Sequence, residues 1–230
     1  MINPQFTNYK TLTFDFYGTL VDWEKSLLDP LRSIVERSGM SPPDAEISAH
    51  FTTLDSDPLT RGFRCYRDVL ALLTRSFAAN YGTAGTDDDV DAVIHAIETA
   101  PPYTETLELL PRWASDYRLV IVSNCDDDII SRTLEAFPFR FNDVVTSEQA
   151  GTYKPDIDIF RLLRERIDEP GESILHIAEW LAEVTPARSL GMGTVWVERT
   201  AWAHVGGNDT PDIKVQTLRD LDAMMHTPGR

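Results

Sequence analysis

The chain has 230 residues and a formal net charge of −16, with 42% hydrophobic and 25% charged residues. This composition fits a folded protein with one large domain, or a core domain with an insertion, and differs from that of disordered chains. The negative charge disfavours nucleic acid and anionic membrane surfaces as partners. The sequence shows no apolar run of about 18 residues and no signal peptide, so a cytoplasmic location is expected.

The first predicted strand, residues 11–15, is an apolar run that ends in Asp15 and breaks at Gly18 and Thr19. A carboxylate at the carboxyl end of a buried parallel strand is placed to act as a nucleophile on a ligand above the sheet. An Asp at a strand end can also be only a turn former or a helix cap. This motif alone therefore leaves the function open.

The next region, residues 23–100, has apolar residues at helical spacing and no convincing strand. Turn signals border it, with Gly18 and Thr19 before it and the prolines at 101 and 102 after it. We therefore expect a helical cap subdomain over 23–100, inserted into a core formed by 1–22 and 101–230. A cap at this position would close over the nucleophile and exclude water.

Four more strand-like runs follow residue 115, at intervals typical of β-α-β units. Together with the first strand they predict a doubly wound parallel sheet of the α/β class. Helices are predicted over 126–136 and 155–167, because the first opens with aspartates and the second has proline in its first turn. The four predicted strands cover 119–123, 143–147, 174–178 and 194–197.

Four segments resemble, in order and spacing, the four motifs of the haloacid dehalogenase (HAD) superfamily. They are 15–19 with the nucleophile Asp, Ser123-Asn124, Lys154-Pro155, and the strand end at 176–179, which runs on to 186–188. Each motif is weak by itself, but their combination in this order is specific. The resemblance covers nearly the whole chain and implies a HAD-like Rossmannoid core with a cap.

Tyr17 points to one branch of that superfamily, the L-2-haloacid dehalogenases of type II. Phosphatase members typically carry a second Asp at this position, which protonates the leaving group. A phenol with a pKa of about 10 is a poor acid for that step at neutral pH. A halide leaves without a proton, so Tyr17 in place of Asp is consistent with dehalogenation.

The resemblance implies a hydrolase that needs no metal and no cofactor. Asp15 would attack C2 of a short (S)-2-haloacid, expel halide and form an aspartyl ester, which water hydrolyses to a 2-hydroxyacid. Lys154 would keep Asp15 ionised and offset the charge of an anionic substrate. Thr19 would hydrogen-bond Asp15.

Three residues are expected to contact the substrate. Ser123 would hold the substrate carboxylate, Asn124 would offer its amide to the leaving halide, and Tyr17 would wall off water beside the reacting carbon. Ser123 and Asn124 also have a purely structural alternative, in which they simply form the turn that ends the strand. In the same way, Thr19 can be only a helix cap and Lys154 only a surface charge.

The fourth motif departs from the dehalogenase pattern, which typically offers a small polar residue, an Asn and an Asp there. This chain has Ala178, Trp180 and Glu183 at those positions. Glu183 or the neighbouring Glu179 would have to activate the hydrolytic water. Trp180 would reshape the pocket and contact the substrate there, and Phe160 lacks the hydroxyl that many dehalogenases place six residues after the lysine.

The cap also lacks an arginine where the family typically has one, since around residues 46–51 the only basic group is His50. Arg61, Arg64 and Arg67 lie further along, and one of them could reach over the crevice from a helix predicted over residues 63–77. We take Arg64 as the candidate for substrate binding. The same spacing is equally typical of a solvated helix face.

Two other functions stay open at this point. One is a Mg²⁺-dependent phosphatase-like hydrolase with Asp15, the carbonyl of residue 17 and Glu179 or Glu183 as ligands. The other is a catalytically impaired protein that keeps the fold and binds ligands. The expected partner is a small anionic substrate, and the resemblance implies a homodimer. The two cysteines are too few for a disulfide scaffold or a zinc site.

Overall fold

The computed structural model describes residues 3–54, 62–199 and 209–226. Within these residues, six parallel strands form one sheet in the order β3-β2-β1-β4-β5-β6. The strands are β1 Thr11–Phe14, β2 Arg118–Ser123, β3 Asp143–Thr146, β4 Ile174–Ala178, β5 Gly193–Val197 and β6 Ile213–Val215. The predicted doubly wound α/β fold is confirmed, and the sequence missed only the short sixth strand of this sheet.

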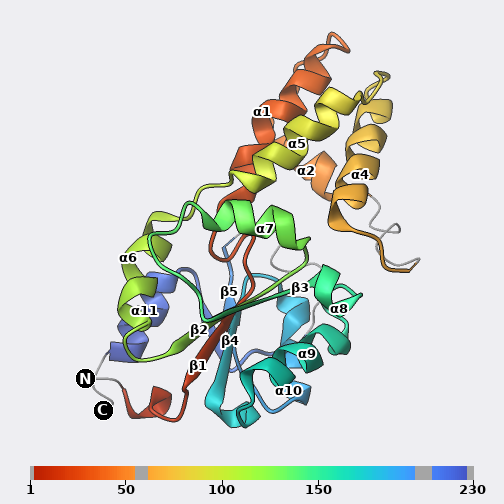
Figure 1. Ribbon diagram of the computed structural model, residues 1–230. Coiled ribbons are helices and arrows are strands. Elements are labelled where there is room, and N and C mark those ends of the chain that lie inside the picture. Colours follow the sequence, from red (N-terminus) through yellow and green to blue (C-terminus); the bar gives the residue numbers. More distant parts are fainter. Residues whose placement is uncertain (1–2, 55–61, 200–208, 227–230) are drawn as a thin grey trace.

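Helices cover both faces of the sheet (Figure 1). Their bounds are α1 Trp23–Glu36, α2 Asp44–Thr52, α4 Tyr66–Asn80, α5 Asp87–Glu98, α6 Thr104–Trp113, α7 Asp127–Leu134, α8 Ser147–Ala150, α9 Ile157–Ile167, α10 Val184–Ser189 and α11 Leu218–His226. Short 3₁₀ helices are η1 Pro4–Phe6, η2 Gly171–Ser173 and η3 Leu181–Glu183. The helices predicted over 126–136 and 155–167 are α7 and α9, shorter than expected by a few residues at their ends. None of the helices in the described ranges is long and apolar enough to cross a bilayer.

The centre of the sheet is where the direction of strand addition reverses. From β1 the chain adds β2 and β3 on one side and β4, β5 and β6 on the other. The carboxyl ends of β1 and β4 therefore meet at a topological switch point, where α/β proteins bind ligands. Asp15, directly after β1, lies at this point.

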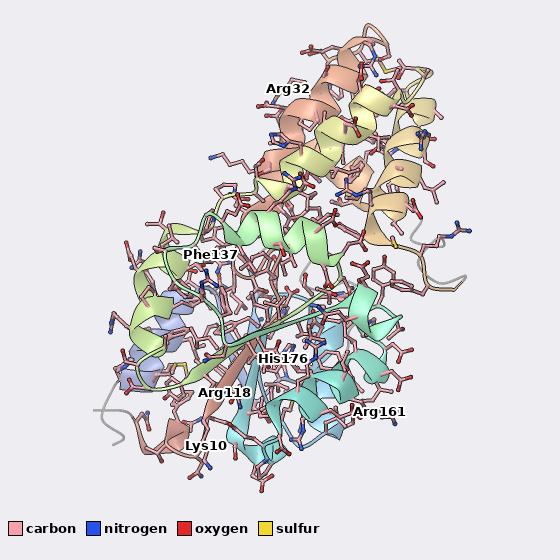
Figure 2. All side chains as sticks on the ribbon, in the orientation of Figure 1. Lys10, Arg32, Arg118, Phe137, Arg161 and His176 are labelled. Carbon is pink, nitrogen blue, oxygen red and sulfur yellow. The ribbon has the colours of Figure 1, made fainter. Side chains whose placement is uncertain are left out.

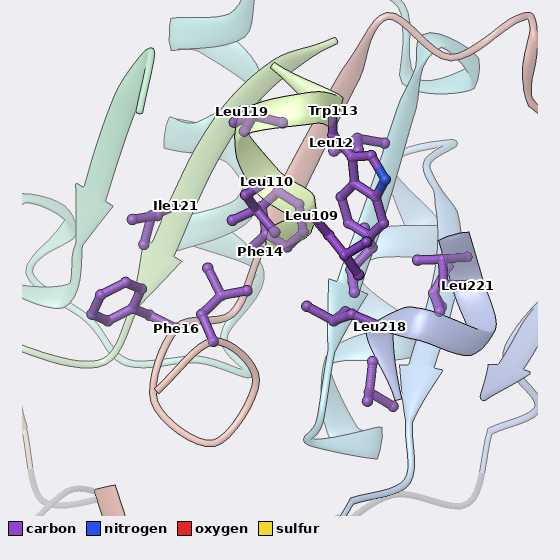
Figure 3. Close-up of a cluster of buried hydrophobic side chains, with 14 of the residues drawn as sticks. Leu12, Phe14, Phe16, Leu109, Leu110, Trp113, Leu119, Ile121, Leu218 and Leu221 are labelled. Atoms are coloured by element: carbon purple, nitrogen blue, oxygen red, sulfur yellow. The ribbon is translucent and has the colours of Figure 1, made fainter. Parts of the chain in front are cut away.

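Side chains on the strands alternate between two hydrophobic clusters. Leu12 and Phe14 on β1 pack with Trp113 of α6 and Leu218 of α11, as Figure 3 shows. On the opposite face, valines 120 and 122 of β2 pack with side chains of α9. Both faces of the sheet are thus buried, so its strands read as nearly continuous apolar runs.

Helices α1, α2, α4 and α5 stand apart from the sheet in Figure 1 and form what we call the helical unit, whose described residues are 23–54 and 66–98. The unit packs around its own hydrophobic cluster, which includes Leu31 and Phe77. The two chain segments that connect it to the core, before α1 and after α5, lie side by side. The N–H of Asp22 in the first donates to the carbonyl of Pro101 in the second at 2.9 Å. The unit therefore joins the core through a narrow double crossing next to the end of β1.

Candidate active site

Asp15 is held in place by both its backbone and its side chain. Its N–H donates to the carbonyl of Ile177 on β4 at 3.0 Å, which continues the pairing of the two central strands. Its Oδ2 accepts from Thr19 Oγ1 at 2.6 Å and its Oδ1 from Lys154 Nζ at 2.6 Å. Gly18, with φ of 94°, makes the intervening turn, and a Cβ there would collide with Glu179. The carboxylate is thus fixed and largely buried, with 8% of the residue exposed.

Lys154 lies at the centre of the buried charges. Besides Asp15, its ammonium donates to Oε1 of Glu183 at 2.9 Å and to the carbonyl of Val122 at 3.0 Å. These three bonds use all three ammonium hydrogens. The backbone of Lys154 is held by Asn124, whose Oδ1 accepts from Lys154 N–H at 2.6 Å and whose Nδ2 donates to its carbonyl at 3.1 Å.

A second chain of contacts extends from Glu183 into the sheet. Oε2 of Glu183 lies 3.1 Å from Nε2 of His176, and Nδ1 of His176 lies 2.9 Å from the hydroxyl of Thr13. Glu183 and His176 are each 1% exposed. We call Asp15, Lys154, Glu183 and His176 the buried charge cluster, since their polar atoms form one connected network.

The two carboxylates of the cluster are perturbed in opposite directions. Burial raises the pKa of Asp15 above its usual value, and the nearby Glu183 adds to this, although Lys154 and Thr19 act against it. Burial also disfavours the charged form of Glu183, but Lys154 and His176 outweigh it and lower its pKa. The two carboxylates likewise outweigh burial at Lys154 and raise its pKa. Lys154 and Glu183 are therefore charged at neutral pH.

Thr19 joins the nucleophile turn to the end of β4. While its hydroxyl donates to Asp15, it accepts from the N–H of Glu179 at 2.8 Å. The carboxylate of Glu179 packs over Gly18, and its carbonyl accepts from Nε1 of Trp196 at 2.8 Å. Of the two predicted candidates for the water-activating base, Glu183 is the one bonded to Lys154.

The structure adds a structural task for Asn124. Its amide holds the backbone of Lys154 through one N–H and its oxygen, and its contact with a leaving halide stays a prediction. Ser123 is buried, and its hydroxyl accepts from the thiol of Cys125 at 3.3 Å. The hydroxyl of Tyr17 bonds with that of Thr133 on α7 at 2.8 Å, and burial raises the phenol's pKa well above its usual value. Tyr17 is thus a neutral side chain between the core and the helical unit.

Arg64, the predicted cationic contact to the substrate, lies just outside the helical unit, and that contact stays a prediction. Helix α4 begins at Tyr66, so Arg64 precedes it, lies exposed and contributes its carbonyl to Tyr153 OH at 2.8 Å. Arg67 forms ion pairs with Glu98 and Asp128, at 3.2 and 2.7 Å. His50 lies in α2, with Nε2 at 3.1 Å from the amide of Asn80, while Arg61 falls outside the described residues. Trp180 is half-buried at the start of η3.

Two contacts were missed from the sequence. Asp126, at the start of α7, accepts from the N–H groups of Tyr66 and Arg67 at 2.7 and 2.9 Å and so caps the first turn of α4. The pair of His176 and Thr13 was also not predicted, although a histidine inside an otherwise apolar strand is a visible signal. Both contacts join segments far apart in the sequence.

The carboxylates of the buried charge cluster are also possible ligands for magnesium. Mg²⁺ requires several oxygen ligands in octahedral geometry. The ammonium of Lys154 lies between Asp15 and Glu183, where a shared cation would have to bind. Among the described residues, no three His, Cys, Asp or Glu side chains are grouped so as to hold a metal ion. The donor set found here therefore does not fit a metal bridged by these two carboxylates.

Comparisons with known proteins show the family of this chain. The sequence profile described as haloacid dehalogenase-like hydrolase matches residues 12–197. An (S)-2-haloacid dehalogenase from Pseudomonas sp. (strain YL) is 24% identical over 231 residues, which is 95% of each chain.

Solved structures show the same fold at low sequence identity. The L-2-haloacid dehalogenase from Xanthobacter autotrophicus with chloropropionic acid covalently bound has a TM-score of 0.77 and 18% identity, covering 93% of this chain and 96% of the other. The HAD-hydrolase YfnB from Bacillus subtilis bound to magnesium also has a TM-score of 0.77, with 22% identity and coverage of 95% and 99%. The shared fold thus includes both dehalogenases and a magnesium-bound hydrolase.

Proposed function

Because this chain belongs to the haloacid dehalogenase-like hydrolase family, we propose that it removes halide from a short (S)-2-haloacid and releases a 2-hydroxyacid. One observation carries the proposal: the 2.6 Å contact between the Asp15 carboxylate and the Lys154 ammonium at the switch point of the sheet. Relatives that match nearly the whole chain include (S)-2-haloacid dehalogenases, which supports the same chemistry.

In the first step, a lone pair of the Asp15 carboxylate forms a bond to C2, and the halide leaves with the electrons of the carbon–halogen bond. Lys154 supports this step through its charge, because all its ammonium hydrogens are already bonded to Asp15, Glu183 and Val122. The substrate carboxylate must therefore meet other donors. Ser123 and the backbone N–H groups beside it are the proposed donors.

In the second step, water attacks the side-chain carbonyl carbon of the Asp15 ester. One water proton passes to Glu183, the bond from that carbon to the substrate oxygen breaks with its electrons going to that oxygen, and the departing oxygen takes up the second water proton as the hydroxyacid forms and the Asp15 carboxylate is restored. The proton on Glu183 then returns to solvent. Glu183 is the proposed base, because it is ionised at neutral pH and Lys154 holds one of its oxygens.

Tyr17 and the helical unit complete the proposed site. The phenol of Tyr17, neutral and bonded to Thr133, leaves no acid two residues after the nucleophile, which suits a leaving group that needs no proton. The helical unit would act as the cap, tied to the core by the Asp126 carboxylate. A cytoplasmic location and assembly as a homodimer belong to the same proposal, and light scattering on the purified protein tests the latter.

Halide release from the two enantiomers of 2-chloropropionate, in the presence of a chelator, tests the function. We expect release from the (S) enantiomer alone, abolished in Asp15→Asn. Asp158→Asn is the matched control, because Asp158 is an exposed carboxylate on α9, and it should keep wild-type activity. Wild-type protein that releases no halide from either enantiomer would refute the proposal.

A magnesium-dependent phosphatase is the second candidate, because the similar YfnB structure is described as bound to magnesium. It would require Asp15, the carbonyl of residue 17 and Glu179 to share the ion, since the ammonium of Lys154 lies between Asp15 and Glu183. Hydrolysis of a phosphomonoester that stops on addition of a chelator would establish this reaction in place of dehalogenation. Ligand-dependent thermal stabilisation without turnover on either substrate would indicate a binding protein instead.

A further inference from the structure

His176 is a buried imidazole that the proposed reaction does not use. It lies on β4, on the sheet face that packs against α9, where the ring of Phe160 meets it edge-on at 5.3 Å between centroids. Figure 2 shows it inside the α/β body, away from the helical unit. The hydrophobic cluster on this face is mostly aliphatic, and the register neighbours of His176 on β1 and β5 are Thr13 and Thr194. An imidazole is acceptable there only because both ring nitrogens have partners.

The partners of His176 fix its hydrogen positions. Glu183 is ionised and can only accept, so Nε2 of His176 carries the hydrogen in the 3.1 Å contact to Oε2. The hydroxyl of Thr13 lies 2.9 Å from Nδ1 on the other side of the ring. Thr13 thereby holds the ring plane, and the ring presents Nε2–H to Glu183.

Each oxygen of Glu183 consequently has its own donor. Lys154 binds Oε1 and His176 binds Oε2, at 2.9 and 3.1 Å. Without His176, Oε2 would be a buried acceptor with no partner, because Glu183 is 1% exposed. The carboxylate would then turn away or take up a proton, and either change removes it as a base.

We propose that His176 is a positioning residue for ester hydrolysis, acting through Glu183. The inference rests on the proposed dehalogenation and assigns His176 to its second step only. The first step depends on Asp15 and Lys154, neither of which His176 contacts. The structure therefore predicts that loss of His176 separates the two steps.

The groups around His176 determine which titration a pH profile of the His176 variants reports. Glu183 faces it from η3, Thr13 from β1 and Phe160 from α9. Its register neighbour on β5 is Thr194, whose hydroxyl donates to Asp212. Beyond Glu183 lie Lys154 and Asp15. Glu183 is the carboxylate in direct contact with the ring, so it is the group that the variants should affect.

Three variants test the proposal by rapid-quench kinetics on (S)-2-chloropropionate. His176→Leu should leave single-turnover halide release within about 3-fold and slow ester hydrolysis roughly 10- to 100-fold. The ester should then accumulate as a mass increase on the Asp15 peptide, and the acid limb of the hydrolysis rate should move to higher pH. His176→Gln, which can place an N–H near the position of Nε2, should recover most of the rate. Thr13→Val keeps the side-chain shape and should cause a smaller loss in the same direction.

Equal slowing of both steps in folded His176→Leu, an unmoved pH profile, or a His176→Gln no better than His176→Leu would each overturn the proposal. If His176→Leu does not fold, Thr13→Val and His176→Gln decide the question by the same measurements. A carbon NMR titration of the glutamate carboxyls, with the Glu183 signal assigned by Glu183→Gln, keeps the test independent of activity. The Glu183 pKa should rise in Thr13→Val and His176→Leu, and no rise would overturn the inference. Absence of halide release by the wild type would instead refute the proposed function.

Discussion

The centre of the sheet and the outer surface of α9 hold ion pairs of the same length in opposite surroundings. Lys154 and Asp15 lie 2.6 Å apart with side chains 2% and 11% exposed. Arg161 and Asp158 also lie 2.6 Å apart, but with side chains 60% and 63% exposed. Figure 2 shows Arg161 at the outer face of the molecule. The distance alone therefore does not tell which pair contributes more to stability. Burial does, because water screens the exposed pair of Arg161 and Asp158 and not the buried pair of Lys154 and Asp15.

The largest expected difference between the two regions is in stability. Lys154→Met leaves two buried carboxylates without their cation, which should lower the free energy of unfolding by about 3–5 kcal/mol. Arg161→Met breaks a surface pair of the same length and should cost less than about 1 kcal/mol. Urea unfolding of both variants measures the contrast. Similar losses in the two would contradict the difference drawn from burial.

A smaller effect is expected where the core meets the helical unit. Asp126→Ala removes the carboxylate that caps α4 and should cost about 1–2 kcal/mol. Asp88→Ala, in the first turn of α5, is the matched control, since this exposed side chain acts mainly on the helix dipole and should cost a few tenths of a kcal/mol. Thermal unfolding compares the two. A loss no larger for Asp126 than for Asp88 would mean that the cap contact contributes little.

The pH dependence of stability should be the most gradual effect and should separate the two buried carboxylates. Glu183 has a lowered pKa in the folded state, so it stabilises the protein above its ordinary value of 4.5 and this contribution is lost as the pH falls below it. Asp15 has a raised pKa, so the folded state binds its proton more tightly and stability falls as the pH rises above 3.8.

Unfolding free energies between about pH 3 and 7 test this contrast. The difference between wild type and Glu183→Gln should shrink as the pH falls below 4.5. For Asp15→Asn the dependence should have the opposite sign. The same sign for both variants would show that the two carboxylates do not differ as described.

Much of the fold and the centre of the site could be predicted because their signals are local. A carboxylate after an apolar run and a lysine before a proline are visible in short segments, and the repeated strands indicate the parallel sheet. The contact of Thr13 with His176 could not be predicted, since it joins residues 163 positions apart on neighbouring strands. The task of Asn124 depends on a backbone 30 residues away. The sixth strand has only three residues, a lysine between two apolar residues, so its sequence shows no clear strand pattern.

Arg64 shows a different limit of sequence patterns. Helical spacing placed it on a helix, but α4 starts two residues later, where Asp126 supplies the cap from another part of the chain. A helix start that depends on a side chain 60 residues away leaves no mark in its own segment. Charge patterns in the helical unit therefore predicted less than those next to the strands.

The central claim is that Asp15 forms a covalent ester whose side-chain carbonyl carbon is attacked by water. A single turnover in water labelled with ¹⁸O, with enzyme in excess over (S)-2-chloropropionate, tests it most directly. The account predicts that the label enters the Asp15 peptide and that the released hydroxyacid carries an unlabelled oxygen from Asp15. Label found in the hydroxyacid, with none in the Asp15 peptide, would contradict it.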